Sequence, residues 1–439
     1  MHLTHHGGKN TVTGSCHELR YENHSILIDC GQFQGKDSKP LDIDFPVKHV
    51  QALIVTHAHI DHIGRIPWLL ATGFKGSIIC TPATAELIPL MLDDGLKLNL
   101  GMKEVSRERV LSLIKSRIFP VDYGKWHRIK GNNLYCRFQP AGHILGSAYV
   151  EIKLPNDKVV VFSGDLGPSN TPLLPDPAPP MRADYLVLES TYGNRNHESV
   201  AQRSGRLREI INRSLSDGGA IIIPAFSVGR TQELLFDIES LIYSSEIERN
   251  IPIILDSPMA ERVTKSYRRY KKLWGREAKR KVADQRHPLA FEQCTVISDY
   301  RKHLAVVNRL ASTGEPAIVV AASGMCEGGR VMAYLKELLP DFRTDIIFSG
   351  YQAEGTLGRM IQSGFEQIEI DGEAVRINAH IHTMSGYSAH ADQQDLIKFV
   401  KGISKAPKEI HLIHGDDEPK RGLRSTLIKE GYARESVII

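Results

Sequence analysis

The residues best suited to chemistry lie in one short run, His-Ala-His-Ile-Asp-His at positions 57–62. An apolar stretch precedes this run, so we expect a strand that opens into a helix at this point. Imidazole and carboxylate groups together suit Zn²⁺ and similar divalent cations. Four such groups exceed what one tetrahedral ion takes from a single loop, and their spacing therefore suggests two ions. One ion would take His57 and His59. The other would take Asp61 and His62.

Further candidate ligands follow other expected strands, each beside a glycine. His143 lies in a glycine-flanked loop, Asp165 follows an apolar run, and His414 ends another. Asp29, which precedes Cys30 and Gly31, has the same character. Each of these residues taken alone is more often an ordinary turn residue. They become ligands only if the fold brings them to the run at 57–62.

The elements that must position these side chains change in pattern along the chain. In the first part, we expect strands over residues 25–29, 51–56, 77–80, 134–139, 147–154 and 158–163. Amphipathic stretches over 63–72 and 83–98 indicate helices. The last two strands are expected to be joined by a tight turn at 153–157.

A proline-rich stretch from Pro168 to Pro180 marks a change to regular βα alternation. Strands are then expected over 219–223, 251–255, 317–321 and 344–348, with helices over 229–243, 258–272 and 328–338. Such alternation predicts a parallel sheet with helices on both faces. From about Glu373 the strand-rich pattern returns, with a strand over 374–383, a helix over 393–401 and a strand over 409–414. We therefore expect one domain made of residues 1–195 and 373–439, with a second α/β domain, residues 196–372, inserted into it.

Composition excludes several classes of protein. The chain has 439 residues, 41% of them hydrophobic and 24% charged, which is ordinary globular composition for about two to three domains. No stretch approaches the roughly 20 apolar residues of a membrane helix, and no secretory signal is expected at the start. The six cysteines are scattered without a Cys-x-x-Cys pair, which favours reduced thiols and a cytoplasmic location.

Positive charge is concentrated in residues 261–286, where 11 Lys or Arg face 3 Asp or Glu, although the whole chain carries only +4. Tyr267, Tyr270 and Trp274 are interleaved with these cations. One interpretation is a solvated basic helix whose aromatic rings enter the core. The other is a surface for a polyanion backbone, on which each contact with a phosphate releases counterions.

Several motifs together resemble a known family. The run HAHIDH, the loop AGHILGSA at 141–148, SGDLG at 163–167 and HGD at 414–416 resemble the metallo-β-lactamase fold. The insertion, LESTYG at 188–193 and SGYSAHAD at 385–392 resemble the β-CASP branch of nucleases, in particular prokaryotic ribonucleases related to the endonuclease subunit of the cleavage and polyadenylation specificity factor. The resemblance covers essentially the whole chain. It implies an α/β protein with a metallo-β-lactamase αββα sandwich and an inserted β-CASP domain of mainly parallel sheet.

The resemblance also implies a ligand set. One Zn²⁺ would be held by His57, His59 and His143. A second would be held by Asp61, His62 and His414, with Asp165 bridging both ions. Asp29 would orient the loop through hydrogen bonds without touching metal. Mn²⁺ or Fe²⁺ would accept the same ligands, so the sequence does not fix the metal.

The activity implied by the resemblance is that of a zinc-dependent ribonuclease. A hydroxide bridging the two metals would attack phosphorus and leave a 5′-phosphate and a 3′-hydroxyl. His390 is expected to give a proton to the leaving oxygen, with Glu189 bonded to its other ring nitrogen. These two residues and Asp61 are the expected catalytic residues. Cleavage within the RNA chain is the expected mode, and 5′-to-3′ exonuclease action stays open.

Two glycine-rich turns between a strand and a helix resemble phosphate seats, because backbone N–H groups and a helix N-terminus can face an anion there. They lie at 224–230 and 322–330. The expected substrate-binding residues are Ser227, Arg230, Ser323, Gly324, Arg330 and Ser388. The expected partner is single-stranded RNA and not a membrane, with substrate selection by the inserted domain, a partner or a homodimer.

Three alternatives remain open at this stage. A DNA-preferring nuclease of the same branch is the closest, and His414 favours RNA over it only by family analogy. A small thioester or ester hydrolase would share the metal site but would need neither the inserted domain nor His390. A scaffold subunit without activity would have no need for a full ligand set.

Overall fold

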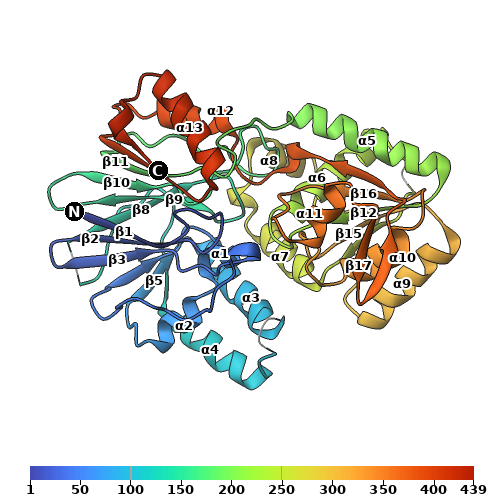
Figure 1. Cartoon of the computed structure of the whole chain (residues 1–439), viewed down its shortest axis with the longest axis horizontal. Coiled ribbons are helices and arrows are strands. Elements are labelled where there is room, and N and C mark those ends of the chain that lie inside the picture. Colours follow the sequence, from blue (N-terminus) through green and yellow to red (C-terminus); the bar gives the residue numbers. More distant parts are fainter. Residues whose placement is uncertain (99–100, 132, 249) are drawn as a thin grey trace. The chain divides into compact units, whose positions relative to one another are not determined.

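The structure is a computed structural model that describes residues 1–98, 101–131, 133–248 and 250–439. The chain forms two compact units (Figure 1). The first unit comprises Met1–Asn196 and His390–Ile439, and the second comprises His197–Ala389. Because the first unit is built from both ends of the chain, the inserted arrangement is confirmed. Among the described residues, no helix has the length and apolar character that crossing a membrane requires.

The first unit contains two sheets. The first sheet has the order β1 (His2–Gly7), β2 (Cys16–Tyr21), β3 (His24–Ile28), β4 (Ala52–Ile54), β5 (Ser77–Cys80) and β6 (Ile118–Pro120). The second has the order β21 (Val437–Ile438), β20 (Glu409–Ile413), β11 (Tyr185–Glu189), β10 (Val159–Phe162), β9 (Ala148–Lys153), β8 (Tyr135–Pro140) and β7 (His127–Arg128). Strands β9 and β10 are antiparallel neighbours, which confirms the turn expected between them.

Successive side chains of strand β10 point to opposite faces of the second sheet, and both faces are buried. Val160 and Phe162 of β10 enter a cluster shared with the first sheet, which contributes Ile28 and Ile54. The neighbouring residue Val161 points to the opposite face, where it joins a second cluster. A strand that is apolar at every position is expected where both faces of a sheet are covered.

Helices complete the sandwich. The second cluster includes Leu396, Phe399 and Leu423, which come from α12 (Gln393–Lys401) and α13 (Asp417–Lys429). The remaining helices of the first unit are α1 (Ile60–Ile63), α2 (Ile66–Ala71), α3 (Pro82–Leu98) and α4 (Glu104–Arg117), of which α3 and α4 contact strands of the first sheet. The expected αββα layering is confirmed.

The second unit is built on a parallel sheet, as expected. Its order is β14 (Cys294–Val296), β13 (Ile253–Asp256), β15 (Ala317–Ala321), β12 (Ala220–Pro224), β16 (Asp345–Phe348) and β19 (His380–Thr383), and every pairing is parallel. The helices are α5 (Val200–Asp217), α6 (Arg230–Tyr243), α7 (Pro258–Arg269), α8 (Arg276–Ala283), α9 (Tyr300–Thr313), α10 (Val331–Leu338) and α11 (Leu357–Gln362).

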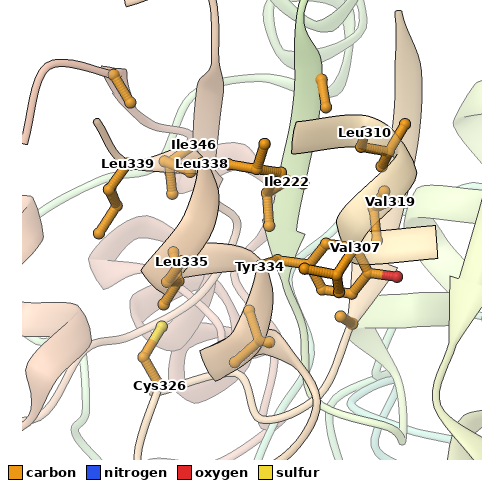
Figure 2. Close-up of a cluster of buried hydrophobic side chains, with 14 of the residues drawn as sticks. Ile222, Val307, Leu310, Val319, Cys326, Tyr334, Leu335, Leu338, Leu339 and Ile346 are labelled. Carbon is orange, nitrogen blue, oxygen red and sulfur yellow. The ribbon is translucent and has the colours of Figure 1, made fainter. Parts of the chain in front are cut away.

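The core on one face of this sheet is shown in Figure 2. Ile222, Val319 and Ile346 of the sheet pack with Val307 of α9 and Tyr334 of α10 (Figure 2). The alternate residues of the same strands are also buried, and α5 and α10 both contact β12. The sheet is therefore covered on both faces, as βα alternation predicts.

The chain leaves the inserted unit later in the sequence than we expected. Residues 374–383 were expected to form one strand of the first domain, but they form parts of two strands of the second unit. Strand β18 (Glu373–Arg376) pairs with β17 (Gln367–Ile370), whereas β19 joins the parallel sheet beside β16. Between them, the N–H groups of Asn378 and Ala379 both donate to the carbonyl of Leu339, which bends the chain away from the hairpin. The compact units therefore divide at 389/390, later than the boundary expected at 372/373, while the first boundary falls at 196/197.

Candidate metal centre

The turn at 57–62 links β4 to α1, as expected, and it is held by the backbone around it. Ser15 N–H donates to the carbonyl of Asp61 (2.9 Å), and Cys30 N–H donates to that of His62 (2.8 Å). Gly31 lies against the same turn, since a Cβ at that position would come within 1.5 Å of the Asp61 carbonyl oxygen. Only glycine fits there without moving the turn. The loop that carries the candidate ligands is therefore fixed from outside.

One group of candidate ligands joins this turn to two other loops. His59 Nδ1 lies 3.2 Å from His57 Nε2 and 3.0 Å from His143 Nε2. Asp165 Oδ2 lies 3.5 Å from Nε2 of both His57 and His143. One ligand atom from each of the four residues lies within 4.8 Å of all the others. This is the group that the resemblance implied for one metal ion.

A second group meets on the other side of Asp165. Asp165 Oδ1 lies 3.3 Å from His62 Nε2 and 3.5 Å from His414 Nε2. Asp61 Oδ2 lies 3.7 Å from the same nitrogen of His62 and 3.9 Å from that of His414. The four ligand atoms again lie within 4.8 Å of one another. All seven expected ligands therefore come together, and the two oxygens of Asp165 face different groups.

The polar atoms inside this cluster fit a divalent cation. His62 Nε2 and Asp165 Oδ1 are buried, and neither has a hydrogen-bond partner in the described part of the chain. Buried polar atoms normally find a partner, so such atoms call for an explanation. A cation between them would supply one, because neutral imidazoles and carboxylates are the donors that Zn²⁺ and similar ions accept. The cluster is a candidate site for divalent metal.

Asp29, which was expected to orient the loop, is hydrogen-bonded to His62 and Thr56. Its Oδ2 accepts hydrogen bonds from His62 Nδ1 (2.7 Å) and from the hydroxyl of Thr56 (2.8 Å), and its Oδ1 accepts one from Thr56 N–H (2.8 Å). The bond to Nδ1 sets the tautomer of His62 and leaves Nε2 to face Asp165.

Glu189 and His390 form a third group with Asp165. His390 Nδ1 lies 3.2 Å from Glu189 Oε2 and 4.0 Å from Asp165 Oδ2. Glu189 Oε1 also accepts the backbone N–H of Leu166 (2.7 Å). The buried carboxylate of Glu189 thus holds His390 and the loop of Asp165 at once.

Electrostatics prepares several of these side chains for ligation. Burial lowers the pKa of His414 to about 3 and holds that of His57 well below its usual range, so both rings are neutral near pH 7. Burial raises the pKa of Asp61 to about 6. Burial opposes a proton on His62, but the carboxylates of Asp165, Asp29 and Asp61 outweigh it and raise the pKa of His62 well above its usual value. This proton must leave before Nε2 can bind a metal.

Relatives of known name match almost the full length of the chain. Ribonuclease TTHA0252 of Thermus thermophilus is 35% identical over 98% of this chain and 97% of its own length. Family models match the metallo-beta-lactamase superfamily at residues 10–196, the Beta-Casp domain at 231–361 and the Zn-dependent metallo-hydrolase RNA specificity domain at 374–439. The chain belongs to the β-CASP branch of the metallo-β-lactamase superfamily.

Other similar proteins are consistent with this family. An RNase J-like protein of Methanocaldococcus jannaschii is 34% identical over 94% of this chain and 92% of its own length. Transcription termination factor FttA of Methanosarcina mazei is 31% identical over 97% of this chain and 68% of its own length. A crystal structure of a protein of unknown function from Enterococcus faecalis V583 covers 100% of this chain and 97% of its own, with a TM-score of 0.55 and 12% identity, which shows the fold alone.

Sequence reasoning missed two residues of this β-CASP site. The hydroxyl of Ser190 donates to the carbonyl of Ile413 (2.6 Å). The hydroxyl of Thr191 donates to the carbonyl of His414 (3.2 Å) and lies 3.4 Å from His390 Nδ1. Both belong to the run LESTYG, of which only Glu189 was assigned a role. They matter because His414 has a left-handed backbone (φ 48°), which is strained for a residue other than glycine and needs such support.

The expected substrate-binding residues all lie in the second unit, and all of them except Ser388 belong to the two glycine-rich turns. The hydroxyl of Ser227 lies 3.1 Å from that of Ser257, and the hydroxyl of Ser323 accepts the N–H of Glu327. The carbonyl of Gly324 accepts Gln352 Nε2 (2.8 Å). Arg230, which ends the first turn, and Ser388 are buried.

Arg330 does not lie as a phosphate ligand would. Its guanidinium donates to Asp256 Oδ1 (2.5 Å) and to the carbonyls of Ile297 (2.6 Å) and Ser298 (2.8 Å). Asp256 is fully buried and also accepts bonds from His303 and Tyr334. The side chain of Arg330 therefore balances a buried carboxylate, which the glycine-rich pattern could not reveal.

Proposed function

We propose that this protein is a metal-dependent ribonuclease that hydrolyses phosphodiester bonds of RNA with two divalent cations bound on either side of Asp165. The observation that carries the proposal is that the two oxygens of this carboxylate face different groups of candidate ligands. Its Oδ2 faces His57 and His143, and its Oδ1 faces His62 and His414. A single structural ion would need only one of these groups.

The family supports RNA as the substrate. The relatives that match most of the chain are named ribonuclease and RNase J-like protein, and the C-terminal match is to an RNA specificity domain. The expected metal is Zn²⁺, two ions per chain, with Mn²⁺ and Fe²⁺ as ions that the same donors accept. When bound, such a pair makes hydroxide available near neutral pH and neutralises charge on the attacked phosphoryl group.

Side chains of this protein would carry out the proton transfer that the reaction also needs. Water releases a proton to solvent and its hydroxide adds to phosphorus, the bond from phosphorus to the 3′-oxygen of the preceding nucleotide breaks, and that oxygen takes a proton. His390 supplies this proton, and the carboxylate of Glu189 holds the ring in place. The products are a 5′-phosphate and a 3′-hydroxyl. Asp61 contributes through its place in the second ligand group.

Substrate would be held as a single strand. Ser227, Ser323 and Gly324 follow the carboxyl ends of the neighbouring strands β12 and β15, where α/β sheets bind ligands. Arg230 begins α6 at the same edge, and Ser388 precedes His390 by two residues. We keep these five residues in the proposal and remove Arg330. Cleavage within the strand, dimer formation and a cytoplasmic location stay predictions.

The test is to incubate the purified protein, supplied with Zn²⁺ or Mn²⁺, with labelled single-stranded RNA, single-stranded DNA and a thioester. We expect cleavage of RNA, with 5′-phosphate ends that a phosphatase can remove. Faster cleavage of DNA would identify the DNA-preferring alternative. Thioester turnover with inert RNA would reject the ribonuclease.

A further inference from the structure

In the basic segment at 261–286, the rings of Tyr267 and Trp274 are buried, whereas that of Tyr270 is partly exposed. Helix α7, a short 3₁₀ helix at Lys271–Leu273 and helix α8 follow one another. Trp274 Nε1 donates to the carbonyl of Tyr267 (3.0 Å), and both rings are buried. The aromatic residues therefore fasten the turn between the two helices to the core. Neither ring is available to stack on a nucleic-acid base.

Five cations of this unit are exposed to solvent. They are Arg268 of α7, Lys272 of the 3₁₀ helix, and Arg276, Lys279 and Arg280 of α8. We call these five residues the basic face. The opposite side carries the buried residues of the same helices, such as Val263 and Ala278.

Nearby acids do not neutralise the basic face. Glu261 pairs with Lys265 (2.6 Å), and Glu277 pairs with Lys281 (3.4 Å), so both carboxylates are taken by cations outside it. Within the ranges that the structure describes, no member of the basic face makes an ion pair. A cation-rich surface that only kept the protein soluble would gain from neighbouring acids, which lower the repulsion between like charges.

We propose that the basic face binds the phosphate backbone of single-stranded RNA, through residues separate from the metal ligands and without reading the base sequence. The inference rests on the proposed ribonuclease function, which supplies a polyanion as substrate. A second copy of the chain would bring the same positive charge and would be repelled. The alternative occupant is an acidic protein. Protein interfaces favour exposed aromatic residues as anchors, and the rings of Tyr267 and Trp274 are buried and so cannot act as such anchors.

Binding of this kind has a measurable signature. Each phosphate contact on a single strand adds about 0.7 to the slope of log affinity against log salt. Four contacts would therefore contribute a slope of about 3, and their loss would flatten the salt dependence by about 2 to 3. The gain would be confined to RNA long enough to supply phosphates in addition to those held at the cleavage site.

The experiment compares two variants with the same change in net charge. The first carries Arg268→Glu, Lys272→Glu, Arg276→Glu and Lys279→Glu. The control carries Lys115→Glu, Arg301→Glu, Lys302→Glu and Lys405→Glu, which are exposed cations of other segments. Binding of labelled RNA is followed by fluorescence anisotropy over a range of salt concentrations, and cleavage of a long and a short RNA is measured in parallel.

We expect the first variant to bind long RNA at least about tenfold more weakly at low salt, with a flatter salt dependence, while kcat on the short RNA is unchanged. The control should keep the wild-type slope. Equal slopes for the two variants would overturn the inference, and that is the result an acidic protein partner predicts. Replacement of the same four residues by Gln, with thermal unfolding as a check, decides the matter if the Glu variant is unstable.

The two proposals can fail separately. If the wild-type protein binds RNA with the expected salt dependence but cleaves no RNA when loaded with metal, the ribonuclease proposal fails and the basic face stands. If it cleaves RNA and the first variant binds like the control, only the basic face fails.

Discussion

Glu189 Oε2 lies 3.2 Å from Nδ1 of His390, while the other oxygen of the same carboxylate accepts the N–H of Leu166. Burial opposes protonation of His390, but the charges of Glu189 and Asp165 outweigh it and raise the pKa of the ring above its usual value. This shift favours the protonated ring, which is the form that a proton donor needs.

Replacement of His390 by Ala should lower RNA cleavage on the order of 10²-fold, because the leaving 3′-oxygen loses its proton donor. Metal content should stay at the wild-type value, since His390 is not among the seven expected ligands. Hydrolysis of bis(p-nitrophenyl) phosphate, whose leaving group needs no proton, should change little and serves as the matched control. Loss of metal in this variant would make His390 a ligand instead.

Glu189→Gln should move the alkaline limb of the pH profile of kcat to lower pH. A Gln keeps an oxygen for Leu166 N–H but removes the negative charge that faces His390. The pKa of the ring then falls, by about one unit for the loss of a neighbouring charge. Activity that needs protonated His390 is lost as pH rises through that pKa, so the loss begins earlier in the variant. An alkaline limb at the wild-type position would show that Glu189 does not tune His390.

Gly31→Ala should weaken metal binding and cleavage together. A Cβ at this position would come within 1.5 Å of the Asp61 carbonyl oxygen, and the shift needed to relieve it costs about 1–3 kcal/mol. That shift moves a turn that carries four ligands, so we expect metal affinity to fall about tenfold or more, measured by competition with a chelator. Gly205→Ala is the control, because Gly205 lies in α5 and a Cβ there would have no other atom within 4 Å outside the neighbouring helix backbone. Undiminished metal affinity in Gly31→Ala would contradict this account of the turn.

Glu18 should make the metal-free protein sensitive to acid. Burial alone would raise its pKa, but hydrogen bonds from His6, His49 and Ser25 lower it to about 2. A carboxylate with a lowered folded-state pKa stabilises the fold above its unfolded-state value, about 4.3, and loses this effect as pH falls toward 2. We expect the free energy of unfolding to drop by roughly 2–3 kcal/mol over this window. The drop should be much smaller in Glu18→Gln, as measured by denaturant titration in the presence of a chelator, and equal drops would contradict the assignment.

The sequence was sufficient to predict which candidate ligands would come together, because the ends of their strands converge. Asp165 and His414 each follow an apolar strand and stand beside a glycine, and His143 lies in a glycine-flanked loop after β8. Strands β10, β11 and β20 are parallel neighbours in one sheet, so their carboxyl ends lie at the same edge. The resemblance to the family then indicated that these three residues, and not other turn residues, would lie beside the run at 57–62.

The sequence was not sufficient to predict features that depend on hydrogen-bond partners or packing neighbours far away in the chain. Residues 374–383 read as one strand, because nothing local shows that Asn378 and Ala379 are held by the distant carbonyl of Leu339. Arg330 lies in a glycine-rich turn typical of a phosphate seat, yet its guanidinium turns to Asp256, more than seventy residues earlier in the sequence. The sequence left open whether Trp274, which lies among cations, enters the core, and the structure shows that its ring is buried.

The central claim is that two metal ions share Asp165 and together make the site active on RNA. The most direct measurement removes metal with a chelator, returns Zn²⁺ or Mn²⁺ in known equivalents, and follows cleavage of labelled single-stranded RNA at each step. We predict little activity without metal and a rise that reaches its plateau at two equivalents per chain. Cleavage that survives removal of the metal, or that saturates at one equivalent, would contradict the claim.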